Sequence, residues 1–471
     1  MLHHDTIVAP ITPPGRGGVA VIRISGVGAI DVVRSIVPEG ALFKILDNPR
    51  LLVLSRLSDL RSSTPDLIDE GLVVFFPAPH SFTGEDVVEL NLHGSPYLVA
   101  QLVQLCCDCG ARMARPGEFS ERAFLNGRID LTQAEAIADL IAAETEAQAQ
   151  VAREQFQGKL AAALSELGEP LRTVLAEIEA YIDFPDEGID FPARSKWEEA
   201  IDRTLNTLSH YIESYKSGRL YREGVKVAIC GLPNAGKSSL LNSLLGEERV
   251  IVSAVPGTTR DAIEEHLSIN GLLVRICDTA GIVTADDLEH CADEIEQRGM
   301  SFSWKRIEAA DLVLLVVDPL APMERQSFFV SRLRATSKKY LIVLNKADLG
   351  LSPEFIDSWT AQSAAGASDV VAISAKTHLG LEVLRGAIYA SVTSSGHSAS
   401  SVLITSERHY QLLCGGQADL LRAKQALNQQ LPPELIALEI RSALSKLSEI
   451  IGITTPEDTL NLIFSRFCIG K

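Results

Sequence analysis

The segment from Gly231 to Ser239 contains the residue types that bind the phosphates of a nucleotide. It reads Gly-Leu-Pro-Asn-Ala-Gly-Lys-Ser-Ser and matches the pattern G-x-x-x-x-G-K-[ST]. In this pattern backbone N–H groups surround phosphate oxygens, and the positive end of the following helix faces them. We expect Lys237 to reach the terminal phosphates and Ser238 to place its hydroxyl on a magnesium ion. The apolar run 225–230 before the segment and the helical run after it favour this interpretation over a chance glycine-rich turn.

Further motifs follow downstream, each next to a segment predicted to be a strand. The polar segment that begins at Gly257 could order around a bound phosphate. The strand at 272–277 leads into Asp278-Thr-Ala-Gly281, where a carboxylate can hold magnesium through water and a glycine N–H can sense the terminal phosphate. The strands at 312–317, 340–344 and 370–373 precede Asp318, Asn345-Lys-Ala-Asp348 and Ser374-Ala-Lys376. Motifs at the carboxyl ends of strands that alternate with helices predict a doubly wound parallel sheet.

Asp348 indicates which base the site prefers. A carboxylate accepts two hydrogen bonds from N1–H and the exocyclic amine of guanine, whereas adenine has no such donor pair. With adenine bound, the Asp348 carboxylate would be left unpaired, so the preference for guanine over adenine should be large. The sequence therefore predicts a guanine nucleotide.

Together these motifs resemble those of the translation-factor-related GTPases. The resemblance implies GTP and Mg²⁺ as ligands, with Ser238 and Thr259 on the magnesium ion. The nucleotide contacts it implies are Asn234, Ala235, Gly236, Lys237, Ser238, Ser239, Ser253, Thr258, Thr259, Asp278, Gly281, Asn345, Lys346, Asp348, Ser374, Ala375 and Lys376.

Ile282 occupies the position at which many small GTPases carry a water-orienting glutamine. Isoleucine cannot orient water, so other groups must assist hydrolysis. In the GTPases that the chain most resembles, an asparagine matching Asn234 helps to bind K⁺, with a loop matching Ser253, Val255 and Thr258. Such a cation neutralises charge that develops during phosphoryl transfer. An ordinary solvated loop asparagine is the alternative for Asn234.

Length and composition are those of a soluble globular protein of about three domains. The chain has 471 residues, of which 46% are apolar and 22% are charged. It contains no apolar run of about 18 residues and no recognisable secretory signal, so we expect a cytoplasmic protein without a membrane contact. The eight cysteines show no paired framework, which fits reduced thiols. The net charge of −18 argues against indiscriminate binding of polyanions, so a nucleic-acid partner would need a local basic patch or another subunit.

Four segments outside the GTPase motifs resemble the tRNA-modifying GTPase family MnmE, also called TrmE, over nearly the whole chain. They are Pro13-Pro-Gly-Arg-Gly-Gly-Val, Ser81-Phe-Thr-Gly-Glu-Asp, Arg115-Pro-Gly-Glu-Phe-Ser-Glu-Arg-Ala-Phe-Leu-Asn-Gly and Phe467-Cys-Ile-Gly-Lys. The resemblance implies an N-terminal domain that forms a homodimer and binds a formyl- or methylene-tetrahydrofolate. It places the folate contacts on Arg23, Glu85, Arg128 and Lys471.

The charges of these four residues suit folate, because cations can bind its carboxylates and formyl oxygen and a carboxylate can accept from pterin donors. Arg128 departs from the family, which commonly has lysine there, and a surface or interface salt bridge is the alternative for each of the four. Cys468 could place a thiol near the one-carbon unit, although a structural role for its sulfur is as well supported.

The acidic run 286–299 reads either as a solvated helix face or as a catalytic segment. The resemblance implies that one glutamate in this run orients the attacking water, and alignment places that role on Glu296. The register around the motif leaves Glu294 as the rival.

The predicted fold class is multidomain α/β, α+β and all-α. A P-loop, Ras-like GTPase domain at 223–394 interrupts a helical domain at 125–222 and 395–471, and a folate-binding and dimerisation α+β domain at 1–124 precedes both. Two unrelated helical regions are the alternative. Thr132-Gln-Ala-Glu135 predicts a capping box that opens one long helix through residue 155, and apolar spacing predicts another at 160–182.

The resemblance implies an enzyme that acts on tRNA together with a flavin-dependent partner, the MnmG (GidA) protein. The pair would install a carboxymethylaminomethyl- or aminomethyl-type group at carbon 5 of the wobble uridine, with a folate donating the carbon. GTP hydrolysis, stimulated by K⁺, would pair two GTPase domains. A regulatory or ribosome-assembly GTPase without modification chemistry is the alternative, and the acidic charge of the chain disfavours it because such proteins usually carry basic RNA-binding modules.

Overall fold

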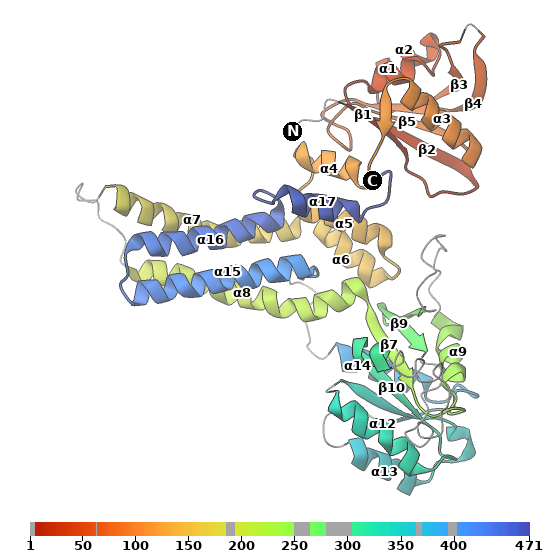
Figure 1. Cartoon of the computed structure of the whole chain (residues 1–471), viewed down its shortest axis with the longest axis vertical. Coiled ribbons are helices and arrows are strands. Elements are labelled where there is room, and N and C mark those ends of the chain that lie inside the picture. Colours follow the sequence, from red (N-terminus) through yellow and green to blue (C-terminus); the bar gives the residue numbers. More distant parts are fainter. Residues whose placement is uncertain are drawn as a thin grey trace, which may run out of the picture. The chain divides into compact units, whose positions relative to one another are not determined.

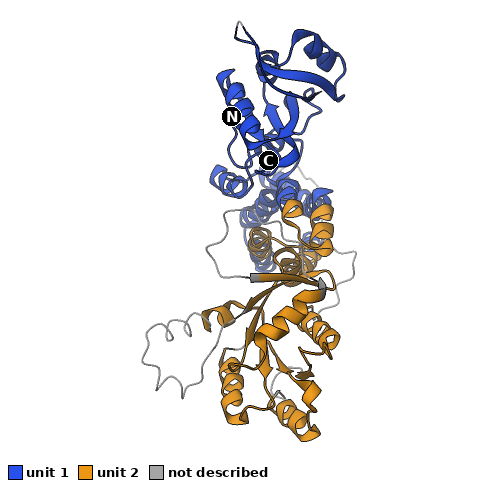
Figure 2. Ribbon diagram, turned by 90° about the vertical axis from the view of Figure 1, so that its right-hand side faces the viewer, with its two compact units in different colours: residues 1–138, 155–201, 418–471 blue, residues 139–154, 202–417 orange. Residues whose placement is uncertain are grey.

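The computed structural model describes residues 5–62, 64–184, 194–248, 264–278, 304–336, 338–363, 370–393 and 403–471. These residues belong to two compact units, which Figure 2 shows in different colours. Unit 1 comprises Met1–Ala138, Gln155–Ile201 and Ala418–Lys471, and unit 2 comprises Asp139–Glu154 and Asp202–Gln417. The limits of the units cut through helices, so the three-domain division at 124/125, 222/223 and 394/395 stays a prediction.

Unit 1 contains a six-stranded sheet, and Figure 1 labels its strands β1 to β5. The strand order is β3-β4-β5-β2-β1-β6. All neighbouring strands are antiparallel except β1 and β6, which are parallel. The strands are β1 (Thr6–Pro10), β2 (Gly17–Ser25), β3 (Val53–Asp59), β4 (Asp66–Phe76), β5 (Val87–Gly94) and β6 (Ala111–Met113).

Three helices pack against one face of this sheet through a buried apolar cluster. They are α1 (Ala29–Arg34), α2 (Glu39–Asp47) and α3 (Pro96–Asp108). The other helices that lie wholly in unit 1 are α4 (Glu118–Leu125), α7 (Lys159–Asp183), α16 (Pro433–Ile451) and α17 (Glu457–Ser465). Phe464 of α17 and Phe467 pack on Leu131 and Ala134, so the C-terminal end of the chain is part of the unit 1 core.

Unit 2 contains a second six-stranded sheet, in the order β12-β11-β10-β7-β9-β8. Its strands are β7 (Val225–Cys230), β8 (Glu264–Ile269), β9 (Leu272–Asp278), β10 (Leu312–Val317), β11 (Tyr340–Leu344) and β12 (Val370–Ala372). The pairs are parallel except for β8 with β9, which is antiparallel. The doubly wound sheet is therefore as predicted, with one antiparallel edge strand that the sequence analysis missed.

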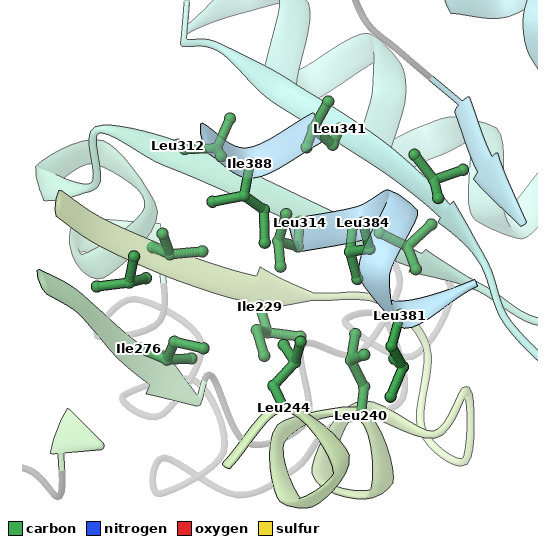
Figure 3. Packing of buried hydrophobic residues seen from close by; sticks show 14 of the residues in the cluster. Ile229, Leu240, Leu244, Ile276, Leu312, Leu314, Leu341, Leu381, Leu384 and Ile388 are labelled. Atoms are coloured by element: carbon green, nitrogen blue, oxygen red, sulfur yellow. The ribbon is translucent and has the colours of Figure 1, made fainter. Parts of the chain in front are cut away.

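Helices cover both faces of the second sheet. Among the described residues of unit 2, four helices with complete bounds are α9 (Lys237–Glu248), α12 (Met323–Ala335), α13 (Pro353–Ser363) and α14 (Leu381–Val392). On one face Leu240 and Leu244 of α9 and Leu381, Leu384 and Ile388 of α14 pack against strand residues (Figure 3). On the other face Phe329 of α12 and Trp359 of α13 are fully buried. A 3₁₀ helix (Ala347–Leu349) follows β11.

In the part of the chain that the structure describes, four helices contain residues of both units: α5 (Leu131–Ala142), α6 (Glu146–Phe156), α8 (Arg194–Glu223) and α15 (Glu407–Asn428). The prediction of one long helix through residue 155 is wrong, because α5 and α6 are separate. Thr145 accepts from the Gln148 backbone N–H at 3.3 Å, and the Gln148 side-chain oxygen accepts from the Thr145 N–H at 3.1 Å. This reciprocal capping starts a new helix at that point.

The capping box of α5 also differs from the prediction. Asp130, not Thr132, accepts from the Gln133 backbone N–H at 2.9 Å, and the Gln133 side chain accepts from the Asp130 N–H at 3.0 Å. The cap therefore lies two residues upstream of the predicted position. No helix among the described residues is both long and apolar enough to span a bilayer.

Candidate functional site

β7 and α9 hold the phosphate loop at the carboxyl edge of the second sheet. β7 pairs with β10 on one side and β9 on the other, so the loop leaves the sheet where its strand order reverses. Gly231 has a φ of 144° and Gly236 a φ of 93°. A side chain at Gly231 would collide with the Val316 carbonyl oxygen, and one at Gly236 with the Asn345 amide. Both glycines are required by the path of the loop.

Lys237 lies inside this loop. Its side chain is buried, and its ammonium donates to the Gly231 carbonyl at 3.0 Å and to the Leu232 carbonyl at 2.8 Å. Ser238 is exposed in the first turn of α9, and Asn234 is exposed with a φ of 62°. The loop thus presents an ammonium, a hydroxyl and an amide within a short stretch of chain, which is the donor set that phosphate oxygens require.

Asn345 ties the phosphate loop to a second loop. Its side-chain N–H donates to the Ala235 carbonyl at 2.9 Å, and its oxygen accepts from the Ala375 N–H at 3.1 Å. The Ser243 hydroxyl of α9 donates to the Ala375 carbonyl at 2.7 Å. Asn345 is only 3% exposed, so these bonds form away from water. Residues far apart in the sequence are therefore held in one fixed arrangement.

Asp348 lies next to this arrangement and is exposed. The Ser374 hydroxyl donates to its carboxylate at 2.6 Å, and this hydrogen bond is the main cause that lowers the pKa of Asp348. The charge of Lys376 lowers it further. Lys346 has a φ of 63° and its ammonium pairs with Asp318 at 2.6 Å. The site thus presents an oriented, ionised carboxylate to a ligand.

Several predicted residues lie outside the described part of the chain. They are Ser253, Val255, Thr258, Thr259, Gly281, Ile282, Glu294 and Glu296. For Asp278 only the backbone is described, and it pairs with Ile229 at the end of β9. The predicted roles of these residues stay predictions.

A second group of predicted residues comes together in unit 1. Arg23 of β2 pairs with Glu89 at 2.8 Å, and its guanidinium carbon lies 4.9 Å from the centre of the Phe82 ring. Glu85 accepts from the Ser25 hydroxyl at 2.7 Å, and the Ser81 hydroxyl donates to the Glu85 carbonyl at 2.5 Å. Because Arg23 and Ser25 are two residues apart on one strand, their side chains share a face of the sheet.

Arg128 and Lys471 join the same group. Arg128 Nε donates to the Ser81 carbonyl at 3.2 Å, although the residue itself is exposed. The Gly117 N–H donates to the Cys468 carbonyl at 3.4 Å, which brings the C-terminal residues back to this domain. Burial lowers the pKa of Lys471; the charge of Cys468 acts against this shift, and the charge of Arg23 adds to it. The last residue of the chain therefore lies within electrostatic reach of Arg23 and Cys468.

Comparison with known proteins identifies the family. The family description "MnmE helical domain" matches residues 131–468, and "GTP-binding protein TrmE N-terminus" matches residues 6–128. The "tRNA modification GTPase MnmE" of Syntrophotalea carbinolica is 40% identical over 474 residues, which cover 100% of both chains. The protein of the same name from Akkermansia muciniphila is 40% identical over 468 residues, 99% of each chain. The chain belongs to the MnmE family.

Membership in the MnmE family confirms the predicted resemblance, and it makes the chain an enzyme of the GTP-hydrolase class. The predicted multidomain fold, with an N-terminal domain, a P-loop GTPase domain and a helical domain, is confirmed as well. Among solved structures, the G domain of the T. maritima FeoB iron transporter is 28% identical over 36% of this chain and 98% of that chain, with a TM-score of 0.28.

Three further residues of this MnmE family member, Thr83, Glu118 and Arg122, belong to the group around Glu85 and were not predicted from the sequence. Arg122 and Glu118 are almost fully buried beside Glu85, and Thr83 shares a hydrogen bond with Ser25 at 2.7 Å. Arg122 and Glu118 lie within the quoted segment 115–127. Charged residues on a short helix usually face water, and nothing in the local pattern indicates that these two are buried.

Proposed function

We propose that this chain binds GTP with Mg²⁺ at the phosphate loop and hydrolyses it during the modification of tRNA. The observation that carries the proposal is the set of hydrogen bonds by which Asn345 and Ser374 fix the phosphate loop and Asp348 in one site. The Lys237 ammonium would exchange its two loop carbonyls for phosphate oxygens, and Asp348 would accept from the guanine edge.

The donors present fit a magnesium–nucleotide complex. Ser238 is exposed at the start of α9, where hydroxyl and phosphate oxygens can share a hard cation, and Thr259 is proposed as the second protein ligand. When bound, the ion would supply charge neutralisation at the phosphates. Glu296, with Glu294 as the rival, is proposed to orient the attacking water. Glu296→Ala should leave nucleotide affinity unchanged in a fluorescent-GDP titration and slow GTP turnover; normal turnover would transfer the role to another residue.

K⁺ is proposed to bind through Asn234, Ser253, Val255 and Thr258 and to supply positive charge near the phosphates. The exposed, left-handed Asn234 supports this, because its side chain is available to a ligand in the loop that holds the phosphates. Pairing of two GTPase domains across this face is proposed to accompany hydrolysis. Replacing K⁺ by Na⁺ at constant ionic strength should lower GTP turnover, and Asn234→Ala should remove the difference. Equal rates in both salts would refute the proposal.

The N-terminal domain is proposed to bind a formyl- or methylene-tetrahydrofolate and to form the homodimer. The residues fit such a ligand: Arg23 and Lys471 offer positive charge, and Glu85 offers a fixed acceptor. Arg128 is proposed as a further contact, and Cys468 as a thiol close to the one-carbon unit. Calorimetric titration with 5-formyltetrahydrofolate should give binding that Glu85→Gln weakens. Arg34→Ala, which changes an exposed guanidinium on α1, is the matched control and should leave binding unchanged.

The substrate proposed for the whole enzyme is tRNA, modified in the cytoplasm at carbon 5 of the wobble uridine together with the flavin-dependent MnmG protein. The added group would be of the carboxymethylaminomethyl or aminomethyl type. Mass spectrometry of tRNA nucleosides should show the modified uridine in cells carrying the gene and its loss in a deletion strain. Unchanged wobble uridines would favour a regulatory or ribosome-assembly GTPase instead.

A further inference from the structure

Arg122 is a buried cation at the base of the group of residues around Glu85. Its side chain is 1% exposed. Nη1 donates to the Asp5 carbonyl at 2.8 Å, and Nη2 donates to the Asp5 carboxylate at 2.7 Å and to Glu118 at 3.3 Å. Removing a guanidinium from water costs free energy, and the hydrogen bonds and ion pairs of Arg122 must offset that cost.

Arg122 also reaches Glu85. Nη1 lies 3.2 Å from each of the two Glu85 carboxylate oxygens. The Ser25 hydroxyl donates to Oε2 of the same carboxylate at 2.7 Å, and the Glu85 backbone N–H donates to Thr83 at 3.2 Å. The Glu85 carboxylate is thus held by two side chains, Arg122 and Ser25. It keeps acceptor capacity on Oε1, and its side chain is still 15% exposed.

A purely structural role, as the counter-ion of Glu118, does not account for this arrangement. Glu118 is fully buried but already accepts from Arg112 at 2.8 and 2.5 Å and from the Arg115 N–H at 2.8 Å. Its contact with Arg122 is longer, at 3.3 Å. Glu118 therefore has a cationic partner even without Arg122. Among the described residues, the cation that contacts Glu85 is Arg122.

We propose that Arg122 is a positioning residue that holds the Glu85 carboxylate so that Oε1 receives an N–H donor of a reduced pteridine. Ser25 assists through its hydrogen bond to Oε2. This inference rests on the proposed folate-binding function, and it adds residues to which no ligand contact has been assigned. Arg122 acts through Glu85 and does not itself touch the ligand.

A double-mutant cycle on ligand affinity tests the proposal. The full-length protein is titrated calorimetrically with 5-formyltetrahydrofolate in four forms: wild type, Arg122→Lys, Glu85→Gln and the double variant. Lysine keeps the buried charge but cannot serve Asp5, Glu118 and Glu85 at once. We expect Arg122→Lys to weaken binding about tenfold, and to weaken it less than about twofold when Glu85→Gln is already present. Ser25→Ala should likewise weaken folate binding in the wild type and have little effect when Glu85→Gln is already present.

Arg115→Lys is the matched control, because Arg115 contacts Glu118 and Glu121 but not Glu85. It should change affinity by less than about twofold. The proposal would be overturned if Arg122→Lys lowered folate affinity by the same factor in the wild type and in the Glu85→Gln variant. Additive effects of this kind are what a structural role predicts. If Arg122→Lys does not fold, the Ser25→Ala cycle decides in the same way. Failure of the wild type to bind the folate is a separate result, which would remove the proposed function and this inference with it.

Discussion

Replacement of Asn345 by alanine should weaken nucleotide binding far more than an ordinary surface truncation. Asn345 is 3% exposed and makes two hydrogen bonds to buried backbone groups, the Ala235 carbonyl and the Ala375 N–H. Each orphaned group costs about 1.5 kcal/mol when no water replaces the lost partner. The two losses together amount to about 3 kcal/mol, which corresponds to roughly a 100-fold change in an equilibrium constant.

This loss should appear mainly in ligand affinity, because both bonds fix loops that surround the phosphate and base positions. A fluorescent GDP analogue titrated into wild-type and Asn345→Ala protein measures the change directly. Urea unfolding of the same proteins shows how much of the loss is general destabilisation. Asn48→Ala provides the control, since it removes an exposed asparagine whose amide caps a helix end by donating to the Lys44 carbonyl.

An Asn345→Ala protein that binds the analogue within about twofold of the wild type would contradict the role given to these two hydrogen bonds. An equally strong loss of nucleotide affinity in Asn48→Ala would contradict that role as well. An equal loss of folding stability and of affinity would show that the two bonds support the whole domain and not the loops in particular.

Three further outcomes are expected. Lys237→Ala should abolish GTP hydrolysis and weaken GTP binding, as measured by phosphate release and titration, because it removes the ammonium that lies within the phosphate loop. Asp348→Asn should transfer preference from guanosine to xanthosine nucleotides in competition binding, and retained guanine selectivity would count against the role assigned to this carboxylate. Glu118 should contribute to acid stability: burial acts to raise its pKa, but hydrogen bonds from Arg112 and the Arg115 backbone outweigh this and lower it from 4.5 to about 2. The stabilisation is therefore complete above about pH 4.5 and lost as the pH falls towards 2, and Glu118→Gln should flatten that part of the unfolding curve.

The central strands of the GTPase domain could be predicted because they are buried on both faces. The run Leu312–Val317 is wholly apolar, and its length and flanking residues indicate a strand. The edge strand β8 was missed, since Glu264–Ile269 mixes charged and apolar residues and leads into no motif. Edge strands depend on a neighbour for half of their burial, and the sequence pattern of one segment does not reveal that neighbour.

Helix composition alone misled the prediction for residues 132–155. The residues are mostly strong helix formers, which favours one continuous helix, but Thr145-Glu-Ala-Gln148 matches the capping-box pattern of a new helix start. The break between α5 and α6 comes from hydrogen bonds between Thr145 and Gln148. Gln148 in turn donates to the Arg222 carbonyl at 2.9 Å, a contact 74 residues away. The start of α6 can therefore be read from the segment itself, whereas the contact with Arg222 that supports it comes from the tertiary structure.

The candidate sites also contain some residues that the sequence identifies and others that only the fold brings together. The phosphate loop is a continuous segment whose glycines and lysine identify it, so its location follows from the sequence. The bridge that Asn345 makes to Ala235 joins residues 110 positions apart, and it becomes apparent only when the strands are assembled. The burial of Arg122 is a further example, because its partners Asp5 and Glu85 come from distant parts of the domain.

Guanine selectivity is the property on which the account depends most directly. Turnover of GTP, ATP and xanthosine triphosphate by the purified wild-type protein, at equal concentrations with Mg²⁺ and K⁺ present, measures it. We expect rapid release of phosphate from GTP and little from the other two. Comparable rates with ATP, or no hydrolysis of GTP, would contradict it.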